Sequence, residues 1–148
     1  MKIKVNDKQF NSKMIYHKND DYYVIKILNK NGTMGYLTFK IKHESYANII
    51  WLNKIETYKK FAHQGVGTAL IQLLEYFAYK NNINYIEGKF YPDNEYAKPF
   101  YEKYGYKIEK EYYETFVSKR LEFDKIKKEI EPNLIKDITK VNQQTIEK

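Results

Sequence analysis

Residues 94–106 read NEYAKPFYEKYGY, and this stretch decides the fold. Asn94 is a residue type that suits a helix N-cap, and Gly105 suits the position just after a helix ends. Between them, apolar and aromatic residues recur at helical spacing (Ala97, Tyr101 and Tyr104). The stretch therefore predicts a short helix that is bounded on both sides.

A glycine-flanked helix start lies upstream, in the segment 55–70 with the sequence IETYKKFAHQGVGTAL. After Gly65, apolar residues continue at helical spacing (Val66, Leu70, Leu73, Leu74 and Phe77). The first turn of a helix has unpaired N–H groups that can bind phosphate, and glycine lets the phosphate approach closely. The segment predicts either a phosphate-binding loop or a strand-to-helix turn whose glycines only relieve strain.

The two best-known phosphate-binding loops are excluded by single residues. A P-loop has a lysine before its final Ser or Thr, whereas Gly67 precedes Thr68 in this chain. A dinucleotide-binding fingerprint has a third glycine at the position that Leu70 occupies.

The two segments together resemble the cofactor motifs of the GNAT acetyltransferase superfamily. The second motif of that family reads Asn-x-x-Ala-x-x-Phe/Leu-Tyr-x-x-x-Gly-Phe/Tyr, and the chain matches it throughout (Asn94, Ala97, Phe100, Tyr101, Gly105 and Tyr106). The first motif reads Arg/Gln-x-x-Gly-x-Gly/Ala. Gly65 and Gly67 match it, whereas Ala62 stands at the Arg/Gln position. The resemblance covers roughly residues 47–121, with both motifs in the expected order and spacing.

The resemblance implies an α/β (α+β) domain with the GNAT fold, in which helices flank a central mixed, mostly antiparallel sheet with splayed central strands. Strand-forming runs support this (22–28, 33–42, 47–57, 84–90 and one or two strands within 106–121). An Asn-Gly turn at 29–32 predicts a hairpin between the first two runs. We expect this acetyltransferase domain to span residues 1–121.

The remaining residues, 122–148, predict a C-terminal helical extension. Apolar residues recur there at helical spacing (Ile126, Ile130, Leu134, Ile138 and Val141). Pro132 is expected to begin a second helix within the extension. The apolar stripe then packs either on the domain or at a homodimer contact.

The resemblance implies direct transfer of the acetyl group of acetyl-CoA to a primary amine of a small molecule or a protein. The implied cofactor-binding residues are a strand edge, the loop and parts of the second motif (Ile55, Thr57, Ala62, His63, Gln64, Gly65, Val66, Gly67, Thr68, Asn94, Tyr101 and Lys103). Because Ala62 replaces the usual Arg or Gln, a non-catalytic CoA-binding or interaction module with the same fold remains an alternative.

The resemblance also implies the catalytic groups. Tyr101 matches the tyrosine that serves the family as general acid to the sulfur of CoA. Glu56 lies where some members carry a glutamate base, and strand alternation puts it on the face opposite Ile55 and Thr57. Glu56 can instead be a solvated carboxylate, in which case the base is a water or a histidine (His17 or His43).

Composition limits the other possibilities. A chain of 148 residues fits one domain, and its lack of cysteine excludes disulfides, thiolate-bound zinc and an acetyl-cysteine intermediate. The three histidines lack metal-ligand spacing, so no metal is expected. No run of 18 apolar residues and no signal-like N-terminus is present, so a cytoplasmic protein without membrane contact is expected.

The net charge of +7 raises the question of a polyanionic partner. Only Arg120 is arginine, the residue best suited to read bases, and abundant Lys, Asn, Ile and Tyr are typical of an AT-rich genome. A nucleic-acid partner is therefore not favoured, but an aminoacyl-RNA amine remains an alternative acceptor. Lysines clustered on the face where the acceptor cleft opens would favour it.

Overall fold

The computed structural model describes residues 1–91, 95–135 and 144–147, the last four as backbone only. The strands are β1 (Lys2–Val5), β2 (Lys8–His17), β3 (Tyr22–Asn29), β4 (Gly32–His43), β5 (Asn48–Thr57), β6 (Tyr85–Phe90), β7 (Lys107–Glu111), β8 (Glu114–Arg120), β9 (Leu134–Ile135) and β10 (Gln144–Glu147). The helices are α1 (Val66–Lys80), α2 (Ala97–Lys103) and α3 (Phe123–Glu129).

These strands form one sheet in the order β7-β8-β6-β5-β4-β3-β2-β1-β9, and β10 pairs with β2. Neighbouring strands are antiparallel except for β5 with β6 and β10 with β2. The predicted mixed, mostly antiparallel sheet flanked by helices is confirmed.

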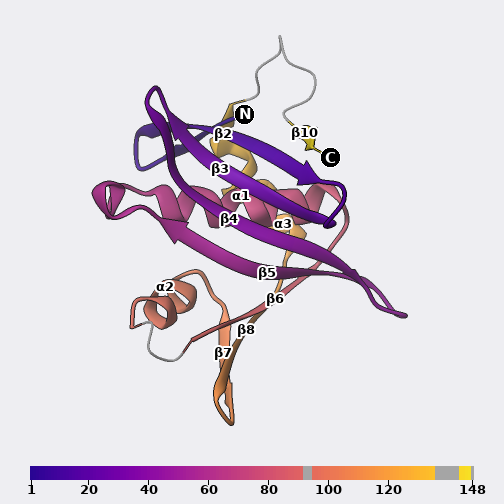
Figure 1. The fold of residues 1–148 in the computed structure, drawn as a ribbon. Helices are drawn as coiled ribbons and strands as arrows, with labels where there is room; N and C mark the ends of the chain where they lie inside the picture. The colour runs from indigo at the N-terminus through magenta and orange to yellow at the C-terminus, as the bar shows by residue number, and fades with distance from the viewer. Residues whose placement is uncertain (92–94, 136–143, 148) are drawn as a thin grey trace.

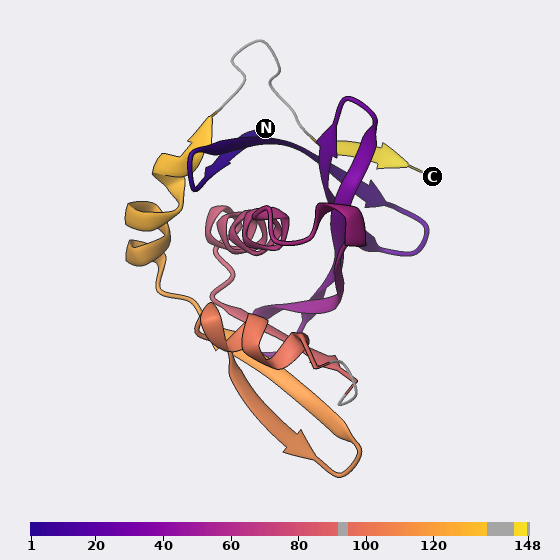
Figure 2. The ribbon, with the colours of Figure 1, turned by 90° about the vertical axis from the view of Figure 1, so that its left-hand side faces the viewer.

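The sheet curves around α1, which lies against the inner face of β2–β5, and α3 lies on the other side of α1 (Figures 1 and 2). Side chains alternate along each strand, so one face of these strands contacts the helix and the other points away from it. The inner face and α1 form a core of fully buried residues (Leu37, Phe39, Ile50, Leu70, Leu74 and Ile86). Burying each such side chain stabilises the fold by about 1.5–3 kcal/mol.

The central strands splay where β5 and β6 separate. The two strands pair only from Ile50 to Leu52 and from Ile86 to Gly88. Asn53 is then an extra residue in the pairing of β5 with β4, because Leu52 and Lys54 oppose the adjacent residues Phe39 and Thr38. A bulge of this kind bends its strand, and β5 continues beyond it without pairing to β6.

Two helices end at residues in the left-handed region of backbone conformation. Asn82, with φ 57°, follows α1, and the N–H of Ile83 donates to the Ala78 carbonyl over 2.8 Å. Gly105, with φ 82°, follows α2 as predicted, and the N–H of Tyr106 donates to the Tyr101 carbonyl over 3.0 Å. Both are Schellman arrangements, which satisfy the last carbonyl groups of a helix.

The start of α2 differs from the prediction. The residue in the N-cap position is Tyr96, not Asn94, and it makes no side-chain cap. Asn94 itself lies outside the described residues.

The C-terminal extension is only partly helical. Its first helix, α3, buries Ile126, and Ile130 just after it is also in the core. The second helix expected at Pro132 is wrong, because a 3-10 turn at Glu131–Asn133 leads into β9, which pairs with β1. Two further residues of the predicted stripe lie outside the described residues (Ile138 and Val141). Among the described helices, none is long and apolar enough to cross a membrane.

Candidate active site

The loop between β5 and α1 presents the open start of a helix. His63 and Gly65 have φ values of 62° and 95°, so the chain turns sharply before α1. The first helical bond runs from the N–H of Ala69 to the Gly65 carbonyl over 3.0 Å. The N–H groups of residues 66–68 precede that bond and are left without intrahelical acceptors. The first turn contains no acidic residue and no side-chain cap, so these donors and the positive helix dipole suit an anion.

The two glycines of this loop serve different purposes. Gly65 needs its positive φ, and a Cβ there would also lie 3.3 Å from Cγ1 of Val5. A Cβ on Gly67 would lie 2.8 Å from Cε1 of Phe100, so this glycine allows α2 to pack closely against the start of α1. A hydrogen bond between the hydroxyls of Thr68 and Tyr104 joins the same two helices. The two sequence motifs therefore meet in space.

Tyr101 is the buried hydroxyl at this junction. Its side chain is 5% exposed and its ring packs on Phe90 and Tyr106, at centroid distances of 5.7 and 5.6 Å. Burial raises the pKa of Tyr101 to about 12, so the hydroxyl stays protonated at physiological pH. Within the described part of the chain it has no hydrogen-bond partner, so its proton is available to a ligand.

Glu56 lies beyond the bulge of β5, on the outer face of the sheet. It is in register with Tyr36, whose hydroxyl donates to the carboxylate over 2.9 Å. Lys54 lies 3.3 Å from the same carboxylate, whose side chain is 41% exposed. Tyr101 is on the inner side, because its ring contacts Tyr106, which is bonded to α1. The buried O–H of Tyr101, whose ring packs on Phe90 of β6, and the accessible carboxylate of Glu56 on β5 thus lie on opposite sides of the sheet.

The sequence model of the acetyltransferase (GNAT) family matches residues 4–106, which is more than half of the chain. This chain belongs to the GNAT acetyltransferase family. The resemblance drawn from the two motifs is thereby confirmed.

Solved GNAT structures share the fold. The chain is similar to PaiA N-acetyltransferase from Thermoplasma acidophilum in complex with coenzyme A, with 19% identity, a TM-score of 0.61, and coverage of 70% of this chain and 63% of that chain. It is also similar to a GNAT-family acetyltransferase from Staphylococcus aureus, with 16% identity, a TM-score of 0.62, and coverage of 72% of each chain. A third similar structure is an Arabidopsis thaliana protein in complex with the bisubstrate analogue CoA-Ac-MVNAL. It has 18% identity and a TM-score of 0.59, with coverage of 66% of this chain and 72% of that chain. No curated protein matches the sequence. At these identities the likeness shows the fold, and the chain spans less than two thirds of the Thermoplasma protein.

The GNAT fold brings some predicted site residues together and separates others. Ile55 and Thr57 pair with Leu37 and Gly35, whose side of the sheet faces α1. They therefore lie on the face opposite to Glu56, as predicted. Other predicted residues line the loop with exposed or half-buried side chains (Ala62, His63 and Gln64). Lys103 lies at the end of α2, with its Nζ 5.4 Å from the Tyr104 ring centroid.

The two histidines considered as bases lie far from Glu56. His43 bonds to Asn48 over 2.8 Å at the start of β5, eight residues before Glu56, which is about 26 Å along a strand. His17 stacks on Tyr22 at the far end of β2. Of the three side chains considered as bases, only Glu56 therefore lies where β5 separates from β6. No group of three or more acidic or histidine side chains in the described residues could hold a metal.

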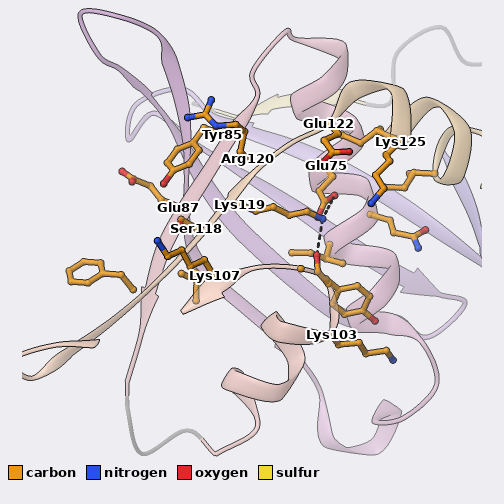
Figure 3. Close-up of a pocket in the computed structure, with 18 of the residues that line it drawn as sticks. Glu75, Tyr85, Glu87, Lys103, Lys107, Ser118, Lys119, Arg120, Glu122 and Lys125 are labelled. Atoms are coloured by element: carbon orange, nitrogen blue, oxygen red, sulfur yellow. Dashed lines mark hydrogen bonds and ion pairs between the residues drawn. The ribbon is translucent and has the colours of Figure 1, made fainter. Parts of the chain in front are cut away.

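The sequence interpretation missed a buried ionic cluster beside a cavity of about 900 Å³ that lies between α1, α3 and the β7–β8 hairpin (Figure 3). Glu75 of α1, 4% exposed, accepts hydrogen bonds from Tyr106 over 3.0 Å and from Lys119 over 3.0 and 3.1 Å. Lys119 also donates to the Tyr104 carbonyl over 2.7 Å. Burial raises the pKa of the Glu75 carboxyl above its ordinary value, and Lys119 and Tyr106 oppose the rise. The available signal was the position of Glu75 on a buried helical stripe, four residues after Ile71 and three before Ala78.

Proposed function

We propose that the chain transfers the acetyl group of acetyl-CoA directly to a primary amine of a small molecule or a protein. The observation that carries this proposal is the pair of functional groups at the splay. Tyr101 lies behind the sheet beside the helix start, and Glu56 lies on the opposite, solvent-facing side. Acyl donor and amine can then approach from different sides and meet between β5 and β6.

The residues at the splay fit the chemical groups of coenzyme A. The free amides at the start of α1 and the positive φ of Gly65 suit a pyrophosphate. The edge of β5 from Ile55 to Thr57, unpaired toward β6, offers backbone groups to the amides of the pantetheine arm. Lys103 suits the 3′-phosphate. Asn94 is the remaining proposed contact and lies outside the described residues. When bound, acetyl-CoA supplies the activated acyl group.

Each catalytic residue holds or moves one proton. The Tyr101 hydroxyl retains its proton up to a pKa of about 12 and can donate it to a departing thiolate. The Glu56 carboxylate can accept a proton from the ammonium form of the acceptor, directly or through one water, because its side chain remains accessible. Tyr36 fixes the orientation of that carboxylate.

The acceptor can include peptide amines. The ligand in the Arabidopsis structure joins CoA to a peptide sequence, so this fold accommodates that kind of acceptor. In the present chain the Glu56 side chain is 41% exposed, which is compatible with an amine carried on a large molecule.

Acetyl-CoA is expected to stabilise the protein against heat. A ligand at 100 times its Kd adds about 2.7 kcal/mol, which for a domain of this size raises Tm by roughly 5–10 °C. Differential scanning fluorimetry checks this, followed by a panel of amines with free-thiol release as the readout. The absence of a shift at millimolar acetyl-CoA would contradict the cofactor assignment. A shift without turnover of any amine would favour the non-catalytic alternative.

Glu56→Gln is expected to lower kcat/KM for the amine by about 100-fold near neutral pH, because general-base catalysis is worth that much. The loss should shrink toward high pH, where free amine forms without help. A rate profile over pH checks this. The matched control is Glu87→Gln, another carboxylate of the outer face, which lies 3.7 Å from Lys42. Equal activity of the Glu56 variant and the wild type would assign the base role to water.

A further inference from the structure

The outer face of β2–β5 is partly exposed, with lysine side chains reaching solvent around the buried Ile15 and Val24. Figure 1 looks onto this face, and Figure 2 shows α1 and α3 on the other side of the strands. None of the described helices covers it. Glu56 lies on it, at the edge where β5 separates from β6.

Lysines gather on this face. Strand register places five of them there (Lys13, Lys26, Lys40, Lys42 and Lys54). Glu56 is the one acidic residue that these four strands place on the face, and it pairs with Lys54. Two neighbouring carboxylates, Glu44 and Glu87, lie 3.9 and 3.7 Å from Lys42. Lys13 and Lys26 are direct cross-strand partners, a like-charged pair that is unfavourable unless an anion lies over it. Among the described residues, no carboxylate lies within ion-pair distance of Lys13, Lys26 or Lys40.

Aromatic rings lie between these lysines. Tyr22, Tyr36 and Trp51 are on the same face and only half-buried. Lys42 Nζ lies 4.7 Å from the Trp51 ring centroid, and Lys54 Nζ lies 5.7 Å from that of Tyr36. Cations interleaved with stacking rings are the arrangement that binds single-stranded nucleic acid, because lysines contact phosphates while rings contact bases. An acidic peptide would use the lysines but would have no comparable use for the rings.

We propose that the outer face of β2–β5 binds single-stranded nucleic acid. Lys13, Lys26 and Lys40 contact the phosphodiester backbone, and Tyr22, Tyr36 and Trp51 receive bases. Lysine binds phosphate as a point charge, so the near absence of arginine is compatible with backbone binding that ignores sequence. Because Glu56 borders the face, an amine carried on the bound strand would reach the acetyl site, an extension that rests on the proposed function.

The test compares two triple variants in fluorescence anisotropy with labelled oligonucleotides of about 12 nucleotides, uridine RNA and thymidine DNA. Three phosphate contacts predict a slope of log K against log salt of about −2, or a loss of affinity of roughly 20-fold between 50 and 200 mM salt. Lys13→Gln/Lys26→Gln/Lys40→Gln should weaken binding at least 10-fold and flatten that slope. RNA and DNA arms show which strand chemistry is preferred.

The control variant is Lys80→Gln/Lys127→Gln/Lys128→Gln, which removes three exposed lysines from helix ends away from this face. It should bind as the wild type does. Equal weakening of both variants would mean that only bulk charge matters, and equal competition by a poly-glutamate peptide would mean an acidic protein partner. Either result overturns the proposal. Acetyl-CoA stabilisation should be the same in both variants, so a failure of cofactor binding is seen separately.

Discussion

Tyr101→Phe is expected to lower kcat for acetyl transfer by about 100- to 1,000-fold, while acetyl-CoA stabilises the variant as much as the wild type. The substitution removes one oxygen from a ring that packs on Phe90 and Tyr106, so the packing persists and only the proton donor is lost. Turnover measured by thiol release, beside thermal stabilisation by acetyl-CoA, separates the two effects.

The pH dependence sharpens this test. Burial holds the pKa of Tyr101 at about 12, so the wild-type rate should not fall between pH 8 and 10 through loss of this proton. Tyr76→Phe is the matched control, since Tyr76 is another buried tyrosine, on α1. It should retain wild-type kcat. Unchanged kcat in the Tyr101 variant with every accepted amine would remove Tyr101 from the mechanism.

Glu75→Leu is expected to destabilise the fold by about 3 kcal/mol at pH 7. Removing one member of a buried ion pair typically costs about 3–5 kcal/mol, and the lower end applies because the Lys119 side chain is 25% exposed and can turn toward water. The Tyr106 hydroxyl also loses its acceptor. Urea unfolding at pH 7 measures the change as a shift of the midpoint with an unchanged m value.

Burial raises the pKa of Glu75 above its value in the unfolded chain. Its protonation therefore contributes to the free energy of unfolding at low pH, and this contribution is lost as the pH rises through the raised pKa. The double variant Glu75→Leu/Lys119→Met should therefore recover much of the loss, since neither charge then needs burial. The control is Glu109→Leu, which breaks the exposed ion pair with Lys107 and should cost less than about 1 kcal/mol. A loss as small as this in the Glu75 variant would contradict a structural role for the cluster.

Local features of the sequence predicted much of the fold. The Asn-Gly turn, the apolar spacing of α1 and the glycine after α2 each depend on neighbours within a few residues, and the structure has all three. The second tail helix failed because pairing of Leu134 and Ile135 with β1 depends on residues at the opposite end of the chain. Helical periodicity cannot register such a partner.

The arrangement at the splay needed the structure for a similar reason. The two motifs indicated which residues belong to the site, but the bulge at Asn53 sets where β5 leaves β6 and which face Glu56 occupies. The role of Glu75 was not predicted, because its partner Lys119 belongs to β8 and lies 44 residues further along the chain. Likewise, the lysine-rich outer face arises from four strands, each of which supplies only one or two cations.

The pairing of β9 with β1 has a consequence for the order of events on the ribosome. Lys2 and Ile3 pair with Ile135 and Leu134, so β1 acquires this neighbour only after the chain has been synthesised as far as Ile135. Contacts this distant in sequence close late, since the entropy of joining remote segments must first be overcome. Until then the edge of β1 stays exposed to strand addition by other chains. The nascent protein thus passes through an interval in which the acetyltransferase motifs are already made and this edge of the sheet is still unpaired.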